Sequence, residues 1–154
     1  MYDDLTKCEI AEIKVSYKTK VKASDRPHVD SSNTAKDLLI KSFDPDTIEL
    51  FETSKAMYLN RSNKVIGVIT ISEGGLTGTI MDVRKILAPA INLMANGIIL
   101  CHNHPSGNEK PSENDILITQ KVKEAAKFFD ITVLDHLIIT PDLRYYSLAD
   151  EGVI

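Results

Sequence analysis

The sequence lacks the features of disulfide-stapled, membrane-spanning and secreted proteins. Two cysteines in 154 residues are too few for a disulfide framework, so the cytosol (a cytoplasmic location) is the expected compartment. No apolar run approaches the roughly 18 residues that a membrane-spanning helix needs. The opening residues, MYDDLTKCEIAEIKV, have no basic region followed by an apolar stretch, as a secretory signal would. We therefore expect no membrane partner.

The basic surplus typical of dedicated DNA-binding proteins is also missing, because the net charge is −4. One local cluster of basic residues surrounds Tyr17 and consists of Lys14, Lys18, Lys20, Lys22 and Arg26. Alternating lysines on an extended ribbon more often protect a sheet edge than bind nucleic acid. DNA is thus a possible partner that the net charge does not support.

The content of 43% hydrophobic and 26% charged residues is that of one globular domain with a real core. Helical periodicity and capping residues predict helices over residues 32–43, 81–97 and 111–129. Strand patterns occupy residues 9–17, 18–24, 53–60, 65–75, 98–101 and 131–140. Because helices interleave with mostly hairpin-connected strands, we expect an α/β (α+β) domain with a mixed β-sheet flanked by helices in two or three layers.

For two central segments, the sequence also predicts which residues are buried. The apolar face of the helix over residues 81–97 is formed by Val83, Ile86, Leu87, Ala90, Ile91 and Met94. Asn96 and Gly97 predict where that helix stops. The continuous apolar run IILC that follows predicts a strand buried on both faces.

Metal-ligand residue types concentrate in HNHPSGNEKPSEND, residues 102–115. An extended segment sends residues i and i+2 to the same face, so His102 and His104 present both rings to one point. A loop shaped by glycine and proline then returns Ser112 as a helix N-cap and Asp115 in the first turn. Two imidazoles and a carboxylate are a normal ligand set for catalytic zinc. The residues therefore predict a Zn²⁺ site.

Each part of this stretch also has a plain structural interpretation. S-x-x-D before an apolar helix is a capping box in its own right, and paired surface histidines are common. Cys101 alternates to the face opposite His102 and is expected in the core. On the strand over residues 131–140, only one of Asp135 and His136 can face the site. His136 is either a contact of the site or a satisfied buried histidine.

The spacing H-x-H-P, six residues, Ser, two residues, Asp resembles the signature of the JAMM (JAB/MPN) metalloprotease superfamily. With VLDH and YYS further along, the chain from about Glu52 onward is similar to the RadC branch of that superfamily. The resemblance implies a cytidine-deaminase-like fold with zinc held by the two histidines and the aspartate. It also implies a glutamate at the start of an upstream strand that activates water. Glu52 occupies the matching position, and Glu49 and Glu73 are competitors.

The resemblance implies a zinc-dependent metallohydrolase that cleaves a peptide or isopeptide bond in an unidentified peptide or protein substrate. Glu52 is the expected general base and then acid, and Ser112 could donate to the developing oxyanion. Two alternatives stay open. One is a non-catalytic zinc-containing domain, in the DNA-repair setting that the RadC name suggests. The other is a metal-dependent enzyme acting on nucleic acid.

The expected organisation is one RadC-like JAB/MPN domain over residues 1–154. It comprises a strand and helix extension over residues 1–45 and a metal-site core over residues 46–154. Full-length RadC-like proteins carry an N-terminal region of helix-hairpin-helix type, and these residues begin instead with strand-like segments. That departure weakens the expectation of DNA binding.

Overall fold

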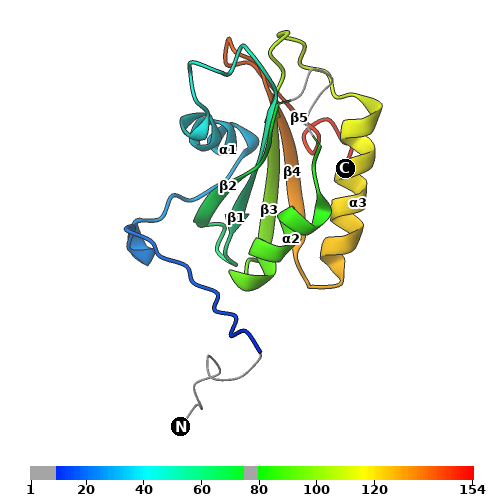
Figure 1. The fold of residues 1–154 in the computed structure, drawn as a ribbon. Helices are drawn as coiled ribbons and strands as arrows, with labels where there is room; N and C mark the ends of the chain where they lie inside the picture. Colours follow the sequence, from blue (N-terminus) through cyan, green and yellow to red (C-terminus); the bar gives the residue numbers. More distant parts are fainter. Residues whose placement is uncertain (1–9, 75–79) are drawn as a thin grey trace.

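A five-stranded mixed sheet forms the centre of the fold in a computed structural model that describes residues 10–74 and 80–154 (Figure 1). The strand order is β2-β1-β3-β4-β5. The strands are β1 (Thr53–Leu59), β2 (Val65–Glu73), β3 (Gly97–Asn103), β4 (Thr132–Ile139) and β5 (Tyr145–Ser147). Only β3 and β4 run parallel among the neighbouring pairs of this sheet. The expected α/β fold with a mixed sheet is confirmed.

Helices cover both faces of the sheet, which makes three layers (Figure 1). On one face lies α1 (Ser32–Leu39), followed by the short 3₁₀ helix η3 (Ile40–Ser42). The other face carries α2 (Val83–Asn92) and α3 (Glu113–Lys127). Every residue of β3 is buried, as its apolar run predicts for a central strand with helices on both sides.

The three α-helices begin where the sequence supplies capping residues. Ser31, Asp82 and Ser112 each accept a hydrogen bond through the side chain from a backbone N–H two or three residues later. Such caps satisfy N–H groups that the first helical turn leaves without a partner. Within residues 10–74 and 80–154, no helix has the length and hydropathy that a membrane crossing requires.

The strands expected before residue 25 are wrong wherever the structure describes them. Residues 10–22 form no strand, and the 3₁₀ helix η2 (Ala23–Asp25) follows them. Ile13 and Val15 are largely exposed, and the Tyr17 hydroxyl donates to Ile66 O on the edge strand β2. The alternating pattern is real, but a strand also needs a partner for its backbone groups, and among the described residues none pairs with this segment. Residues 1–9, with Cys8, lie outside the described part.

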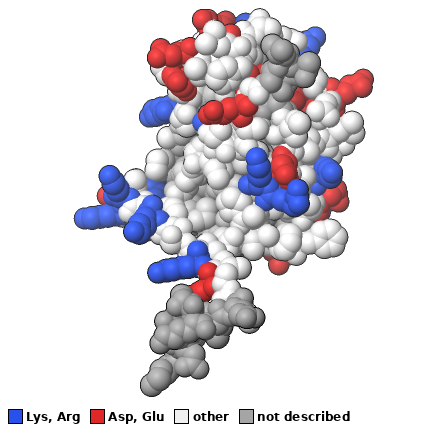
Figure 2. Space-filling view, viewed as in Figure 1, with Lys and Arg blue, Asp and Glu red and all other residues white. Residues whose placement is uncertain are grey.

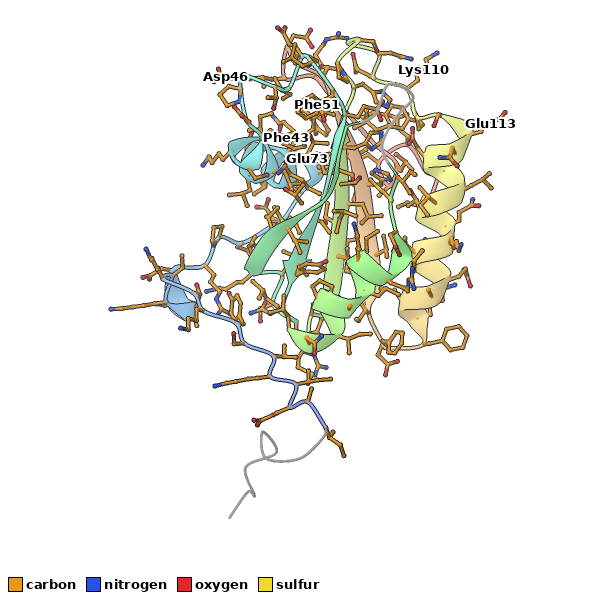
Figure 3. All side chains as sticks on the ribbon, viewed as in Figure 1. Phe43, Asp46, Phe51, Glu73, Lys110 and Glu113 are labelled. Carbon is orange, nitrogen blue, oxygen red and sulfur yellow. The ribbon has the colours of Figure 1, made fainter. Side chains whose placement is uncertain are left out.

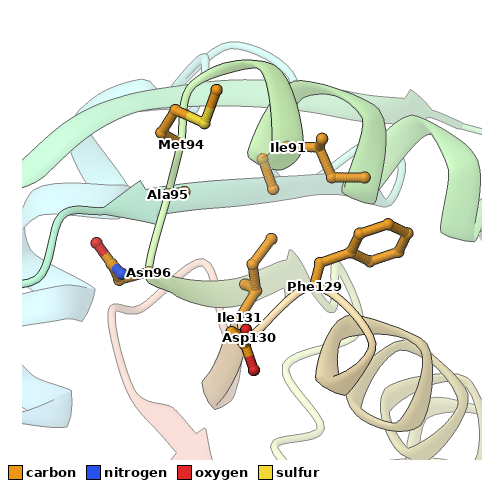
Figure 4. A pocket seen from close by; sticks show the side chains of 8 residues that line it. Ile91, Met94, Ala95, Asn96, Phe129, Asp130 and Ile131 are labelled. Carbon is orange, nitrogen blue, oxygen red and sulfur yellow. The ribbon is translucent and has the colours of Figure 1, made fainter.

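The helix expected over residues 81–97 ends at Asn92, earlier than predicted. Met94 adopts a left-handed conformation (φ 52°) and is 81% exposed, so its placement on the buried face is wrong. Ile91 is also partly exposed, at 38%. Both residues border a cavity of about 290 Å³ with Phe129, which follows the end of α3 (Figure 4). The chain has to leave the helix there because it must turn into β3, which begins at Gly97.

Tyr58 ties the sheet to α2 and offers a test of this packing. Its side chain is 1% exposed, and its hydroxyl donates to the carbonyl oxygen of Ile86 at 2.8 Å. Tyr58→Phe leaves that buried carbonyl without this donor, so we expect the free energy of unfolding to fall by about 1–2 kcal/mol. Urea denaturation measures the change. Tyr146→Phe is the control, because the Tyr146 hydroxyl makes no hydrogen bond within the described residues, and an equal loss in both variants would contradict the assignment.

Candidate metal centre

Three side chains converge at the end of β3 and the start of α3. His102 Nε2 lies 3.0 Å from His104 Nε2 and 3.4 Å from Asp115 Oδ1. His104 Nε2 lies 3.8 Å from Asp115 Oδ2. These three residues form a group that could hold a metal ion. The i, i+2 spacing on β3 and the loop into α3 produce the cluster that the sequence predicts, so the His/His/Asp arrangement exists in the fold.

A chain of hydrogen bonds orients the His102 ring from behind. His102 Nδ1 lies 2.8 Å from His136 Nε2, and His136 Nδ1 contacts Thr119 Oγ1. The Thr119 hydroxyl donates to the Asp115 carbonyl oxygen, so its own oxygen is left to accept from His136 Nδ1–H. Burial, with the nearby His102, lowers the pKa of His136 well below its ordinary value, so this ring is neutral and carries one proton. His136 Nε2 is then an acceptor, and His102 must donate from Nδ1.

The loop that follows His104 orients its ring in the same way, through a hydrogen bond at Nδ1. Its Nδ1 lies 2.7 Å from the carbonyl oxygen of Asn108, which can only accept. Both histidines therefore donate outward from Nδ1 and turn Nε2 toward each other. Two Nε2 lone pairs at 3.0 Å repel, so the arrangement favours a cation between them, either a shared proton or a metal ion. The arrangement is that of metal-binding histidines whose second nitrogen is hydrogen-bonded to the protein.

Asp115 serves the helix cap and the cluster with different oxygens. Oδ2 accepts from the backbone N–H and the hydroxyl of Ser112, while Ser112 Oγ accepts from the Asp115 N–H. Oδ1 faces His102. Burial raises the pKa of Asp115. The hydrogen bond and charge of His102, in the state where its Nε2 carries the proton shared with His104, and the bonds from Ser112 outweigh burial, so the net pKa lies below the usual range. The capping box and the ligand interpretation of S-x-x-D are thus compatible.

Asn103 points to the opposite face of β3 and holds the segment that carries Glu52. Its Oδ1 accepts from the Thr53 N–H at 2.6 Å. Its Nδ2 donates to the carbonyl oxygens of Ile48 and Phe51 at 2.7 and 3.0 Å. The side chain is fully buried, so these bonds replace water for every polar atom of the amide. The residue between the two histidines therefore fastens the chain on both sides of Glu52.

Comparison with known proteins places this geometry in a family. A family model described as "RadC-like JAB domain" matches residues 29–153. The chain belongs to the RadC family. A "UPF0758 protein" of Flavobacterium johnsoniae is 50% identical over 97 residues, which cover 63% of this chain and 42% of that relative. "UPF0758 protein CPE2144" of Clostridium perfringens is 38% identical over 153 residues, or 97% of this chain and 62% of the relative.

A further "UPF0758 protein", from Porphyromonas gingivalis, is 47% identical over 98 residues, covering 64% of this chain and 43% of the relative. The RadC chain described here therefore spans less than half the length of the first relatives it matches. Its predicted division at residue 45 is tested neither by these matches nor by the structure and stays a prediction.

Of the three glutamates that the sequence offers as a base, Glu52 approaches the cluster of this RadC domain. Its Oε1 lies 4.0 Å from His104 Nε2, and its side chain is 28% exposed. Glu49 and Glu73 are exposed, and Glu73 interacts electrostatically with Lys55, which packs over Phe43 on the α1 side of the sheet. Glu73 labelled in Figure 3 lies toward that side. The roles of Glu52 as base and of Ser112 as oxyanion donor stay predictions.

The remaining sequence expectations divide between the two faces of the sheet. Cys101 is fully buried, and burial raises the pKa of its thiol, which confirms a core residue. Asp135 faces away from the cluster and accepts from the Ser147 hydroxyl and the Ala149 N–H. The sequence left two alternatives for His136, and both hold: it is a buried histidine with its hydrogen bonds satisfied, and it contacts the site through His102.

The sequence did not predict the involvement of Thr119 or the role of Asn103. The only available signal for Thr119 was its place one helical turn after Asp115.

The hydrogen-bond chain behind His102 predicts that Thr119 contributes to metal affinity. Thr119→Val keeps the shape but removes the acceptor for His136 Nδ1–H, so His136 no longer has a defined orientation toward His102. We expect the affinity for added Zn²⁺ to fall about tenfold or more, as for other hydrogen-bond partners of ligating histidines. Competition with a chromophoric chelator measures it. Thr132→Val, at an exposed position of β4, is the matched control. Equal Zn²⁺ affinities for the two variants would show that the hydrogen bonds from Thr119 through His136 to His102 do not contribute to metal binding.

The contacts of Asn103 predict a local effect on the Glu52 segment. Asn103→Ala removes three hydrogen bonds to the backbone, so the Thr53 amide should exchange with solvent at least tenfold faster, with unfolding free energy lowered by about 1–3 kcal/mol. Hydrogen exchange measures the first effect. Asn60→Ala is a suitable control because the Asn60 side chain accepts from the backbone N–H groups of Ser62 and Lys64 in the β1–β2 turn. Unchanged exchange at Thr53 would contradict the role of Asn103.

Proposed function

We propose that this RadC domain is a zinc-dependent hydrolase of a peptide or isopeptide bond. The observation that carries the proposal is the pair of inward-facing Nε2 atoms, 3.0 Å apart, beside one carboxylate and within reach of a second one on Glu52. Three protein donors with two histidines and one carboxylate are typical of catalytic zinc sites, which keep one position open. Structural zinc sites use four protein ligands, mostly cysteines, and the buried Cys101 points away.

The separations of the donor atoms fit zinc. Tetrahedral zinc with ligands near 2.0–2.1 Å places neighbouring donor atoms about 3.3 Å apart. His102 Nε2 lies 3.0 Å from His104 Nε2 and 3.4 Å from Asp115 Oδ1, and these distances lie on both sides of that value. Calcium and magnesium are disfavoured because both prefer oxygen ligands over imidazole nitrogen.

In the proposed reaction, Glu52 transfers a proton from the attacking water to the leaving amine. His102, His104 and Asp115 would hold the zinc ion, which would supply a Lewis acid and lower the pKa of a bound water to about 7. Glu52 Oε1 accepts a proton from the attacking water, whose oxygen forms a bond to the carbonyl carbon of the substrate. The C–N bond then breaks, and Glu52 delivers the proton to the leaving amine. The fixed backbone on either side of Glu52 holds its carboxylate close to His104.

Ser112 supports the site through Asp115. Its hydroxyl donates to Asp115 Oδ2, which keeps Oδ1 turned toward His102. The predicted hydrogen bond from Ser112 to the oxyanion requires this hydroxyl to rotate away from Asp115. In the structure the Ser112 hydroxyl is therefore bound to Asp115, and it could contact the substrate only after that rotation.

The charges around the site support an amide over a nucleic acid as substrate. Figure 2 shows mostly Asp and Glu at the end of the molecule where α3 begins, while Lys and Arg follow the N-terminal segment at the other end. Asp46 and Glu113, labelled in Figure 3 with Lys110, are exposed at the acidic end. Arg144 at this end is paired with Glu109 and Asp142. Phosphodiester backbones bind where positive charge gathers, so an acidic rim disfavours them.

Replacing the proposed base and one proposed ligand separates catalysis from metal binding. Asp115→Ala removes a ligand and should lose the zinc, whereas Glu52→Gln should keep about one zinc per chain and lose turnover by a factor of at least about 100. Elemental analysis of the purified proteins and a fluorogenic peptide library measure the two properties. Glu49→Gln, at the exposed glutamate three residues away, should keep both.

Two other outcomes would change the proposal. Loss of zinc from Glu52→Gln would make Glu52 a ligand instead of the base. A parent protein that holds zinc in the open site and hydrolyses no amide would favour the non-catalytic alternative.

A further inference from the structure

We propose that a cavity beside the donor cluster binds an apolar side chain of the substrate, on the residue that supplies the scissile carbonyl. The inference rests on the proposed hydrolase function. It adds a substrate class, peptides with an apolar residue before the cleaved bond, that the donor set alone does not specify.

The cavity opens directly onto the proposed ligands. Its volume is about 170 Å³, and the residues that line it are Ile80, Met81, His102, Asn114, Asp115 and Ile118. Two of them, His102 and Asp115, belong to the donor cluster. A carbonyl placed at the cluster thus has this cavity next to its own Cα and side chain, whereas Glu52 lies beside His104, which does not line the cavity.

Three of the six lining residues offer hydrocarbon contacts to an apolar group. Ile80, Met81 and Ile118 supply hydrocarbon from the segment before α2 and from α3. Asp115 is the charged group of the lining, and its oxygens are engaged by Ser112 and face His102. A charged side chain would lose hydration there without gaining a free partner, which costs several-fold to many-fold in affinity. The ring of His102 and the amide of Asn114 are the other polar groups of the lining, and the amide suits the backbone of a peptide.

The size of the cavity fits one medium side chain. A protein cavity of about 150 Å³ lined by aliphatic and aromatic residues is large enough to bind benzene. The space beside the cluster is slightly larger, at about 170 Å³, so it accommodates a side chain of the size of leucine. Glycine would leave it empty and lose the contribution from burial of apolar surface.

A second cavity, at the other end of α3, differs from this one in its lining. The space between the ends of α2 and α3, lined by Ile91, Met94 and Phe129 among others, is larger but contains none of the donor residues (Figure 4). Nothing in the described structure indicates what would occupy it. It therefore offers control positions for the cavity beside the cluster.

Binding of metal-directed probes tests the proposal without turnover. N-acetyl amino-acid hydroxamates carry a group that coordinates zinc and a side chain in the position of the residue before the cleaved bond. Calorimetry with the zinc-loaded full chain should give a dissociation constant for the leucine hydroxamate about tenfold or more below that of the glycine hydroxamate. The aspartate and lysine hydroxamates should bind no better than the glycine compound.

Two variants at Ile118 and one control assign the preference to this cavity. Ile118→Phe fills the space and should abolish the preference for leucine, while Ile118→Ala enlarges it and should shift the preference toward the phenylalanine hydroxamate. Ile91→Phe, in the other cavity, should leave the leucine preference unchanged. The opposite effects of the two Ile118 variants distinguish occupancy of the cavity from a general loss of folding.

The possible results distinguish a failure of the apolar subsite from a failure of the proposed metal site. Equal affinity for leucine and glycine hydroxamates, or tighter binding of a charged one, would overturn the apolar subsite and leave the metal site intact. Failure of every hydroxamate to bind the zinc-loaded protein would overturn the open coordination position, and the subsite with it. A leucine preference that survives in Ile118→Phe would also overturn the assignment to this cavity.

Discussion

The convergence of two histidine Nε2 atoms at 3.0 Å is the constraint on which the rest of the site depends. Each ring is held from behind, His102 by His136 and His104 by the Asn108 carbonyl oxygen, so neither can turn its lone pair away. Positive charge between the rings stabilises such an arrangement. The fold therefore favours a cation at this point, and the nearby carboxylate of Asp115 adds to the attraction.

The central strand β3 makes this possible because its residues alternate between two covered faces. Even-numbered His102 points toward α3 and the cluster, while Asn103 points toward the α1 side and fastens the segment around Glu52. One short stretch of strand thus supplies a proposed ligand on one face and positions the proposed base from the other. The sheet can do so because the neighbouring strands β1 and β4 hold β3 on both edges.

The parts of the fold that the sequence predicts well are those with a strong local pattern. β1, β2, β3 and the three main helices appear where periodicity and capping residues place them, with ends displaced by a few residues. The errors occur where a pattern needs a partner that local sequence does not contain. Residues 10–22 alternate like a strand but form no strand pairing in the described structure, and Met94 continues an apolar helical face after the helix has ended.

For the site, the sequence by itself determined the residue types of the cluster and their shared direction. An i, i+2 pair on a strand and a carboxylate in a capping box are set by backbone geometry over a few residues. Only the tertiary structure decided that Glu52, and neither Glu49 nor Glu73, reaches the cluster, and that His136 and Thr119 orient His102. Those contacts join residues 17 to 52 positions apart, which sheet order and helix packing bring together and which no local pattern encodes.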